Sequence, residues 1–213
     1  MTPTAILKKS DIRKLLPQRA ADSHKGQNGR VLIIGGSLEY YGAPILAGLA
    51  ALSGGADLVT LLVPECNFDI SRSYYPDFIV RTYGGNHLNV RVLEAATPLL
   101  ENADVVLIGP GITKNEDVTT NVEKLLRRIT VPVVLDADAL PAVLDLEHDP
   151  ARPLVLTPHH GEFKMLIEEP LDENTSPEEL VSLLAQYSEK WRSVVVLKSS
   201  HTLIAAPDGE MRM

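Results

Sequence analysis

The chain has 213 residues, of which 45% are apolar, and its formal net charge at pH 7 is -8. This length suits one large α/β domain or two small ones. The absence of a basic cluster with interleaved aromatic residues argues against a nucleic-acid partner, and no apolar run approaches the ~18 residues of a membrane span. Cys66 is the single cysteine, which excludes an internal disulfide and fits the reducing cytoplasm, where we place the protein.

Short apolar strands alternate with helices along the chain. The expected helices are 10–16, 44–53, 117–129, one after Gly161, and 177–191, with Ser10 and Ser176 as caps of the first and last. The expected strands are 31–34, 57–63, 105–108, 131–135, 154–156, 193–197, 203–206 and a returning strand from 210. Near-continuous Val, Ile and Leu strands predict a mostly parallel central sheet with helices on both faces. Without a repeat or a linker, residues 1–213 are expected to form one α/β domain.

Glycine loops follow two of these strands. The stretch from Gly35-Gly36-Ser37 to Tyr41-Gly42-Ala43-Pro44 joins a strand to a helix N-terminus. Glycines let a ligand approach the backbone there, and free N–H groups with the helix dipole favour an anion. The stretch matches neither the dinucleotide fingerprint nor a P-loop, and a tight turn is the alternative. Gly109-Pro110-Gly111 could form the same kind of backbone surface for a ligand, or it could be a simple turn.

Two carboxylates follow the strand at 131–135. Asp136 and Asp138 are separated by one residue, and such residues face the same side of a strand. The pair could orient a metal–phosphate or a ribose. Alternatively, one carboxylate caps the helix that begins near Ala139, and the other is a solvated turn residue.

Polar residues also follow two later strands. His159 and His160 come before Glu162, which could hold a hydrated magnesium ion or complement the dipole of a helix. One of the two histidines is expected to be a surface residue. Lys198-Ser199-Ser200-His201-Thr202 offers a cation, hydroxyls and N–H groups that suit phosphates, although a polar β-turn has the same composition.

The loops, in this order, resemble the ADP- or ATP-dependent NAD(P)H-hydrate dehydratases of the ribokinase-like superfamily. The resemblance runs from about Leu7 to Gly209 and implies a ribokinase-like fold. Its matching stretches are 24–26, 35–37, 41–44, 109–111, 136–140, 157–162 and 198–202.

The resemblance implies a hydrated cofactor, NADHX or NADPHX, as the substrate. ADP or ATP with Mg²⁺ would phosphorylate the ring hydroxyl, and loss of phosphate would return NAD(P)H. Carried over by position, the substrate-binding residues are Ala43, Asp138, Gly109, Gly111 and His159, and Glu162 would place the metal. The nucleotide-binding residues are Lys198, Ser199, Ser200, His201 and Thr202. The resemblance also implies a homo-oligomer, commonly a tetramer, and leaves open ADP or ATP and NADHX or NADPHX.

Two features depart from the family. Ser199 stands where the family has a glycine, and if the position needs a positive φ, serine costs about 1–2 kcal/mol or shifts the loop. The family's Gly-Thr-Gly-Asp stretch, whose aspartate deprotonates the hydroxyl, is absent from the 213 residues, and we expect that aspartate to lie beyond Met213. General-base catalysis contributes roughly 10²–10⁴-fold, so we expect little or no dehydratase activity from this chain alone and assign it no catalytic residue.

The same absence predicts a fold that is incomplete at its C-terminal end. Residues 1–213 would correspond to about three quarters of the family's domain, and the missing helices would leave apolar sheet surface bare. At about 25 cal/mol per Å², ~400 Å² of bare surface forfeits roughly 10 kcal/mol. The chain is therefore expected to be part of a longer product or to cover this face by oligomerising.

Two other functions fit the same loops. A ribokinase-like kinase for a small alcohol, such as a vitamin precursor, would phosphorylate its substrate and stop. A non-catalytic module would keep the nucleotide pocket without the base. The stretches 41–44 and 158–162 favour the dehydratase over the kinase.

Overall fold

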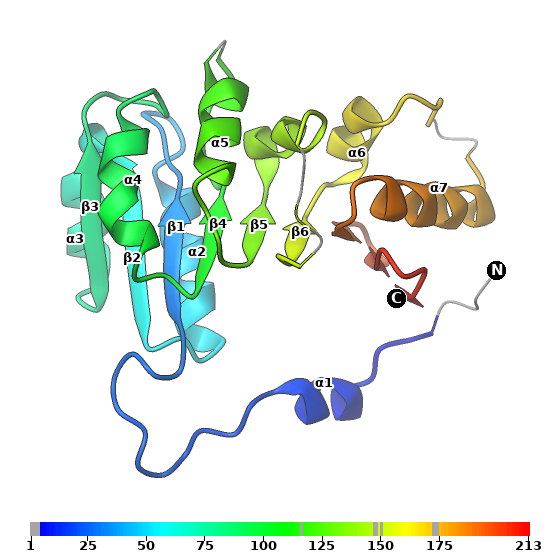
Figure 1. The fold of residues 1–213 in the computed structure, drawn as a ribbon, viewed down its shortest axis with the longest axis horizontal. Coiled ribbons are helices and arrows are strands. Elements are labelled where there is room, and N and C mark those ends of the chain that lie inside the picture. Colours follow the sequence, from blue (N-terminus) through cyan, green and yellow to red (C-terminus); the bar gives the residue numbers. More distant parts are fainter. Residues whose placement is uncertain (1–4, 116, 147–148, 150, 172–174) are drawn as a thin grey trace.

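The computed structural model describes residues 5–115, 117–146, 149, 151–171 and 175–213. Nine strands of this part form one sheet in the order β3-β2-β1-β4-β5-β6-β7-β8-β9 (Figure 1). Strands β1 to β7 are parallel to one another, β8 is antiparallel to β7, and β9 is antiparallel to β8. The strands are β1 Arg30–Ile34, β2 Leu58–Pro64, β3 Phe78–Tyr83, β4 Val105–Ile108, β5 Val133–Leu135, β6 Leu154–Leu156, β7 Val194–Leu197, β8 Leu203–Ala205 and β9 Met211–Arg212.

One helix, α1, precedes the sheet, and the other helices lie in the connections between the parallel strands. The helices are α1 Lys9–Leu15, α2 Gly42–Ser53, η1 Glu65–Asn67, α3 Phe68–Tyr74, α4 Val92–Leu100, α5 Val118–Leu126, η2 Ala137–Val143, α6 His160–Leu166 and α7 Pro177–Lys190, with η marking a 3₁₀ helix. Ser176 caps α7 as expected, because its hydroxyl accepts a hydrogen bond from the Glu179 N–H at 3.2 Å. No helix of the described residues is long and apolar enough to cross a membrane.

The sheet is covered on both faces only over its first strands. One core cluster joins the face that carries Leu32, Val106 and Leu156 to α4, α5, η2, α6 and α7. A second cluster joins the opposite face, which carries Ile33 and Leu61, to α2 and α3. Figure 1 shows α4 and α5 in front of the strands β1 to β4. The expected mostly parallel α/β sheet is confirmed.

The second face continues across β5 to β8 without a helix from the described residues. The strand register aligns Leu107 with Val134, Val155 and Val194 in turn, and it aligns Val196 with Ile204. We call Val134, Val155, Val194, Val196 and Ile204 the valine face. These side chains are half-buried and belong to neither core cluster. Helices on both faces are therefore present over β1 to β4, and beyond them the second face consists of the half-buried valine face.

The first helix differs from its prediction. It begins at Lys9, and the carboxylate of Asp11 accepts a hydrogen bond from the Lys8 N–H at 3.0 Å. Ser10 therefore lies inside the first turn and is not the cap. No residue of α1 is buried.

The segment before α1 is anchored at the other end of the chain. Ala5 pairs with Arg212 of β9. The Leu7 N–H donates to the Met213 carbonyl at 2.9 Å, and the Met213 N–H donates to the Ala5 carbonyl at 3.0 Å. The first described residues therefore lie along the last strand of the sheet.

The Asp57 carboxylate fastens the loop that leads into β1. Asp57 accepts hydrogen bonds from the Gly26 and Asn28 N–H groups at 3.0 Å each, and from Arg19 at 2.8 Å. The side-chain and backbone bonds from Asn28 are the main reason that the pKa of Asp57 is lowered. The motif His24-Lys25-Gly26 is thereby held at the amino end of β2.

The neighbours Val195 and Val196 test the uneven coverage of the sheet. Val195 is fully buried in the first core cluster, whereas Val196 lies on the valine face. We expect Val195→Ala to lower the free energy of unfolding by about 2 kcal/mol and Val196→Ala by less than about 1 kcal/mol. Urea unfolding of both variants measures the difference. Equal losses would mean that the valine face is covered in solution.

The Asp57 anchor predicts a dependence of stability on pH. Because the pKa of Asp57 is lowered in the fold, its contribution is present above the unfolded-state pKa of about 3.9 and is lost as pH falls through the folded-state pKa. The stability difference between the wild type and Asp57→Asn should therefore be largest near neutral pH and shrink below about pH 4. Urea unfolding across this range measures it. A stability difference that stays constant from neutral pH to about pH 3 would contradict the anchor.

Candidate functional site

The strand order reverses its direction between β1 and β4. The sheet grows from β1 through β2 to β3 on one side, and from β4 through β5 to β9 on the other. In open α/β sheets, ligands bind outside the carboxyl ends of the strands at such a switch point. Because β1 and β4 to β7 are parallel, the residues that follow them lie at one edge of the sheet, which we call the rim. The rim comprises 35–44, 109–115, 136–138, 157–162 and 198–202.

Ala43 and Gly111 contact each other at the rim. Gly111 has a φ of +75°, and a Cβ atom added there would lie 3.0 Å from the Ala43 Cβ and 2.3 Å from the Tyr40 carbonyl oxygen. Ala43 belongs to the first turn of α2, so the loop after β4 abuts the start of the helix that follows β1. The two predicted residues therefore form one surface without a polar side chain.

Gly109 packs against the backbone of the next strand end. Its φ is +128°, and an added Cβ would lie 1.8 Å from the Asp136 carbonyl oxygen. No side chain fits in this space, so the glycine is needed for the close approach as well as for its backbone conformation. The contact joins the loop after β4 to the loop after β5.

The Asp136 carboxylate connects three strand ends. Its Oδ1 accepts a hydrogen bond from the Thr157 hydroxyl at 2.7 Å and from the Lys198 ammonium at 2.7 Å. The partners follow β6 and β7, so one carboxylate links the loops after β5, β6 and β7. Asp136 occupies the N-cap position of η2, as one alternative expected of this pair, but its side chain makes no capping hydrogen bond.

Asp138 does not share a strand face with Asp136. Ala137 has a φ of +50°, which is uncommon outside glycine, and the 3₁₀ helix η2 begins at this residue. The alternation argument that paired the two carboxylates therefore fails, because Asp138 lies in a helical turn. Asp138 faces a hollow that also reaches Glu162.

His159 and Glu162 form a capping box at the start of α6. The His159 Nδ1 accepts a hydrogen bond from the Glu162 N–H at 3.1 Å, and the Glu162 Oε2 accepts one from the His159 N–H at 2.7 Å. The backbone of Lys198 donates to the Pro158 carbonyl at 2.8 Å, which brings the loop after β7 beside His159. His160, the first residue of α6, is exposed.

The loop after β7 is closed by its own hydroxyls. Ser199 donates to the His201 carbonyl at 2.6 Å, and Thr202 donates to the Ser199 carbonyl at 3.5 Å. Ser199 does not have a positive φ, so the backbone strain considered for a serine at this position is absent. Ser200 and His201 are exposed. The loop therefore presents its polar groups to solvent beside the Lys198 ammonium.

A hollow of about 260 Å³ opens at the rim, and we call it the rim hollow. Its lining residues are Lys114, Asn115, Val118, Thr119, Ala137, Asp138, Leu140, Pro141, Leu144, Glu162, Met165 and Leu166. Among the predicted site residues, only Asp138 and Glu162 line it. The glycines, His159 and the 198–202 loop lie elsewhere on the rim. Lys114 and Asn115 were missed by the sequence analysis, although a cation three residues after a glycine loop is a usable signal.

The side chains of the rim hollow include carboxylates of the kind that bind a magnesium ion. Within the described ranges there is no group of three or more His, Cys, Asp or Glu side chains that could hold a metal ion. Magnesium is usually bound through one or two carboxylates, water and substrate phosphates. Asp138 and Glu162 line one hollow, so the residues present fit a hydrated ion whose other ligands come from phosphate.

The residue that serves as the general base is not assigned at the rim. The 213 residues contain no Gly-Thr-Gly-Asp stretch, and we assign no residue of the rim as the catalytic base. Two rim carboxylates already have partners, because Asp136 accepts bonds from Thr157 and Lys198, and Glu162 accepts the bond of the α6 cap. The rim therefore shows binding and positioning groups.

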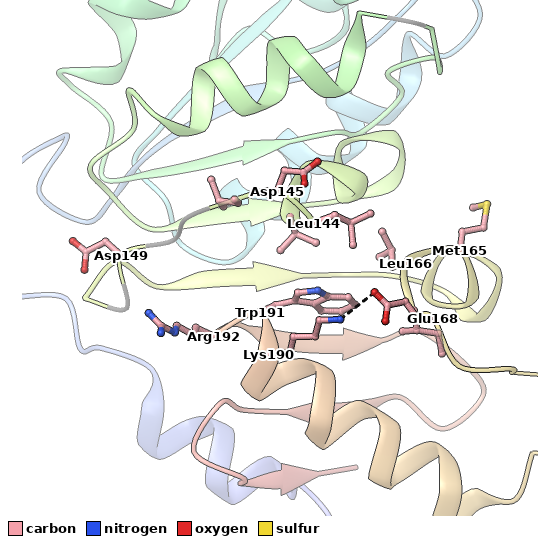
Figure 2. Close-up of a pocket in the computed structure, with 12 residues that line it drawn as sticks. Leu144, Asp145, Asp149, Met165, Leu166, Glu168, Lys190, Trp191 and Arg192 are labelled. Carbon is pink, nitrogen blue, oxygen red and sulfur yellow. Dashed lines mark hydrogen bonds and ion pairs between the residues drawn. The ribbon is translucent and has the colours of Figure 1, made fainter.

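A larger hollow, of about 1050 Å³, lies away from the glycine loops (Figure 2). Figure 2 shows Lys190 and Glu168 facing each other beside Trp191, and their ion pair measures 3.4 Å. Trp191 is largely buried and packs edge-on against Phe163. None of the predicted site residues lines this hollow, so it is not the candidate site.

Comparisons with known proteins point to one family. A family model described as NAD(P)H-hydrate dehydratase matches residues 31–213. A bifunctional NAD(P)H-hydrate repair enzyme Nnr of Moorella thermoacetica is 38% identical over 208 residues, which are 93% of this chain and 38% of the relative. An ADP-dependent (S)-NAD(P)H-hydrate dehydratase of Nitrosopumilus maritimus is 36% identical over 198 residues, 91% of this chain and 67% of the relative. The chain thus spans little more than a third of the bifunctional relatives.

Solved structures match in fold. A ribokinase-like superfamily protein of Enterococcus faecalis superposes with a TM-score of 0.80 at 26% identity and covers 100% of this chain and 72% of its own. An ADP/ATP-dependent NAD(P)H-hydrate dehydratase of Bacillus subtilis, co-crystallized with ATP/Mg²⁺, has a TM-score of 0.73 at 28% identity, over 99% of this chain and 72% of its own.

Gly109 and Gly209 form a matched pair for testing the close approach at the rim. Both have a positive φ, but nothing lies within 4 Å of an added Cβ at Gly209. We expect Gly109→Ala to lower the free energy of unfolding by about 3 kcal/mol or more, because overpacking adds to backbone strain. Gly209→Ala should lower it by only about 1–2 kcal/mol. Urea unfolding measures both, and losses of the same size would contradict the crowding at Gly109.

Proposed function

Because the chain belongs to the NAD(P)H-hydrate dehydratase family, we propose that it binds NADHX or NADPHX together with ADP or ATP, as part of an enzyme that removes water from the nicotinamide ring. The relative named as an ADP-dependent dehydratase supports this proposal. The observation that carries it is the unbroken series of contacts along the rim, from Ala43 to Gly111, from Gly109 to Asp136, and from Asp136 to Lys198.

In this proposal the glycine side of the rim binds the hydrated cofactor. Ala43, Gly109 and Gly111 offer backbone and small side chains, so a flat ring can lie close to the chain. His159 and Asp138 would supply polar groups from the neighbouring strand ends of the same rim. The His159 Nδ1 is occupied by the capping bond, and its Nε2 lies 3.5 Å from the Glu162 Oε1, so the ring is held beside Glu162.

The loop Lys198, Ser199, Ser200, His201 and Thr202 would bind the nucleotide. The Lys198 ammonium is held at the rim by Asp136, which places a cation beside the exposed part of the loop before any phosphate arrives. A charge-assisted contact of this kind contributes more than a neutral hydrogen bond. Asp136 therefore acts as a positioning residue for Lys198.

Glu162 would hold Mg²⁺, with Asp138 at the same hollow. A bound Mg²⁺ would neutralise phosphate charge. One Glu162 oxygen already accepts the His159 N–H, so the carboxylate is fixed in orientation by the cap. The B. subtilis protein co-crystallized with ATP/Mg²⁺ supports Mg²⁺ as the ion that accompanies the nucleotide.

We also propose that these 213 residues turn over slowly on their own. Phosphorylation of the ring hydroxyl converts a poor leaving group into a good one, and a general base is needed to remove the hydroxyl proton. The Gly-Thr-Gly-Asp stretch that supplies this base in the family is absent from the sequence up to Met213. A missing general base corresponds to a loss of roughly 10²–10⁴-fold.

The cellular setting belongs to the same proposal. We place the protein in the cytoplasm, because a single exposed thiol at Cys66 suits a reducing compartment. A homo-oligomer that buries the valine face would remove apolar surface from water, which favours association.

Two lysines in similar ion pairs test the nucleotide site. The Lys198 side chain is 45% exposed and pairs with Asp136, and the Lys190 side chain is 51% exposed and pairs with Glu168, away from the rim. We expect Lys198→Met to weaken binding of ADP or ATP with Mg²⁺ by about 10-fold or more, because a hydrogen bond to a charged group contributes about 1.5–3 kcal/mol. Lys190→Met should leave the affinity unchanged. Isothermal titration calorimetry of the 213-residue chain measures both.

Two results would overturn this proposal. One is an absence of heat with either nucleotide at millimolar concentration. The other is an equal effect of the two lysine variants. Incubation of the wild type with NADHX, ADP or ATP and Mg²⁺, followed by the near-ultraviolet absorbance of NADH, separates slow turnover from binding alone. Complete and rapid recovery of NADH would contradict the proposed loss of rate.

A further inference from the structure

Two hollows at the rim share one wall. The rim hollow contains Asp138 and Glu162, and a second one, of about 150 Å³, lies beside it. We call this second one the outer hollow. Its lining residues are Leu38, Glu39, Asn86, His87, Thr113, Lys114 and Asn115. Lys114 and Asn115 line both hollows, so these two residues form the wall between them.

The shared wall lies at the switch point of the sheet. Leu38 and Glu39 follow β1, and Thr113 to Asn115 follow β4, the two strands between which the order reverses. The Leu38 N–H donates to the Asn86 carbonyl at 2.8 Å, which ties this corner to the residues after β3. Ligands of open α/β sheets bind at this position, and a long ligand would extend to both sides of it.

The sizes of the hollows favour a ligand that occupies both. Ligand pockets usually have volumes of roughly 300–1,000 Å³. The rim hollow and the outer hollow, at about 260 and 150 Å³, each fall below this range, whereas together they reach it. A dinucleotide consists of two nucleosides joined by a pyrophosphate, so it matches two hollows separated by a cation.

Lys114 is available for that pyrophosphate. Over the described ranges it has neither a hydrogen bond nor an ion pair. The side chain lines both hollows, so its ammonium can reach a ligand that crosses the wall. A compact ammonium on a flexible stem suits a phosphate contact.

The outer hollow has the groups that a nucleoside needs. Leu38 is 57% exposed, which is a large fraction for leucine, and its side chain offers an apolar surface to a base. Glu39 is the single carboxylate among the lining residues of the outer hollow, and it accepts a hydrogen bond from the Thr113 hydroxyl at 3.5 Å. An ionised carboxylate accepts hydrogen bonds and repels phosphate, so it favours a ribose hydroxyl over a 2′-phosphate.

We infer that Lys114 binds the pyrophosphate of the dinucleotide substrate, that the nicotinamide half extends from Lys114 past Asp138 of the rim hollow toward the glycine surface while the adenosine half occupies the outer hollow, and that Glu39 makes the site prefer NADHX over NADPHX. This inference rests on the proposed function and adds a binding residue and a specificity residue to it. The preference follows because the two cofactors differ only in the 2′-phosphate of the adenosine ribose, which the outer hollow would receive beside Glu39.

The experiment uses calorimetry of the 213-residue chain with NADH and with NADPH as probes. We expect the wild type to bind NADH more tightly than NADPH. Lys114→Met should weaken the binding of both probes by about 10-fold, because each carries the same pyrophosphate. Glu39→Gln should shift the ratio of the two affinities toward NADPH by about fivefold, since it removes an exposed repulsion.

Matched variants at exposed positions control for charge. Lys124→Met on α5 and Glu94→Gln on α4 remove the same charges from exposed positions and should change neither affinity. Binding of ADP or ATP with Mg²⁺ should be unaffected by Lys114→Met, because that site depends on Lys198.

The outcomes separate the inference from the proposed function. If the wild type binds both probes and Lys114→Met has no effect beyond its control, the two-hollow arrangement is wrong while the proposed substrate stands. An unchanged affinity ratio in Glu39→Gln overturns the specificity assignment in the same way. If the wild type binds nucleotide but neither probe, the proposed substrate and the inference fail together.

Discussion

The site depends on one close approach between two backbones. At Gly109 the loop after β4 lies so near the Asp136 carbonyl that an added Cβ would be 1.8 Å from it. This approach fixes Asp136, whose carboxylate then joins Thr157 and Lys198 from the next two strand ends. The glycine surface near Ala43 and the polar loop at 198–202 are consequently held at a set distance. A ligand that contacts both the glycine surface and the 198–202 loop therefore binds to groups whose relative positions are already fixed.

Strands with strong apolar character were predictable from the sequence. The strands at 105–108 and 154–156 have the expected bounds, because each is a short apolar run enclosed by turn residues. The region from η1 to α4 was not predicted. There β3 is an edge strand of the sheet and carries the exposed Arg81, and α4 contains Pro98. Neither segment therefore shows a regular hydrophobic period that would predict a strand or a helix. Both elements are stabilised by tertiary packing that a local pattern does not show.

The candidate site could be predicted in outline but not in its detail. Strand ends of a parallel sheet share one edge, so the loops could be placed together without coordinates. The position of Asp138 could not, because β5 ends at Leu135 and a 3₁₀ helix begins at Ala137 with a positive φ, so strand alternation does not reach Asp138. Lys114 was missed because its importance comes from two hollows in space. Ser199 replaces the family's glycine without strain, since the loop there keeps an ordinary φ.

The uneven helix coverage divides the sheet into a part that helices enclose on both faces and a part that they cover on one face only. Strands β1 to β4 are enclosed by helices on both sides, whereas β5 to β8 have a helix layer from the described residues on one side only. Local opening is easier where fewer apolar contacts must be broken, so the loop after β7 is expected to detach before the glycine loops do. A ligand that spans the rim would then hold the two parts together. Part of its binding free energy would appear as slower hydrogen exchange of the backbone amides in β5 to β8.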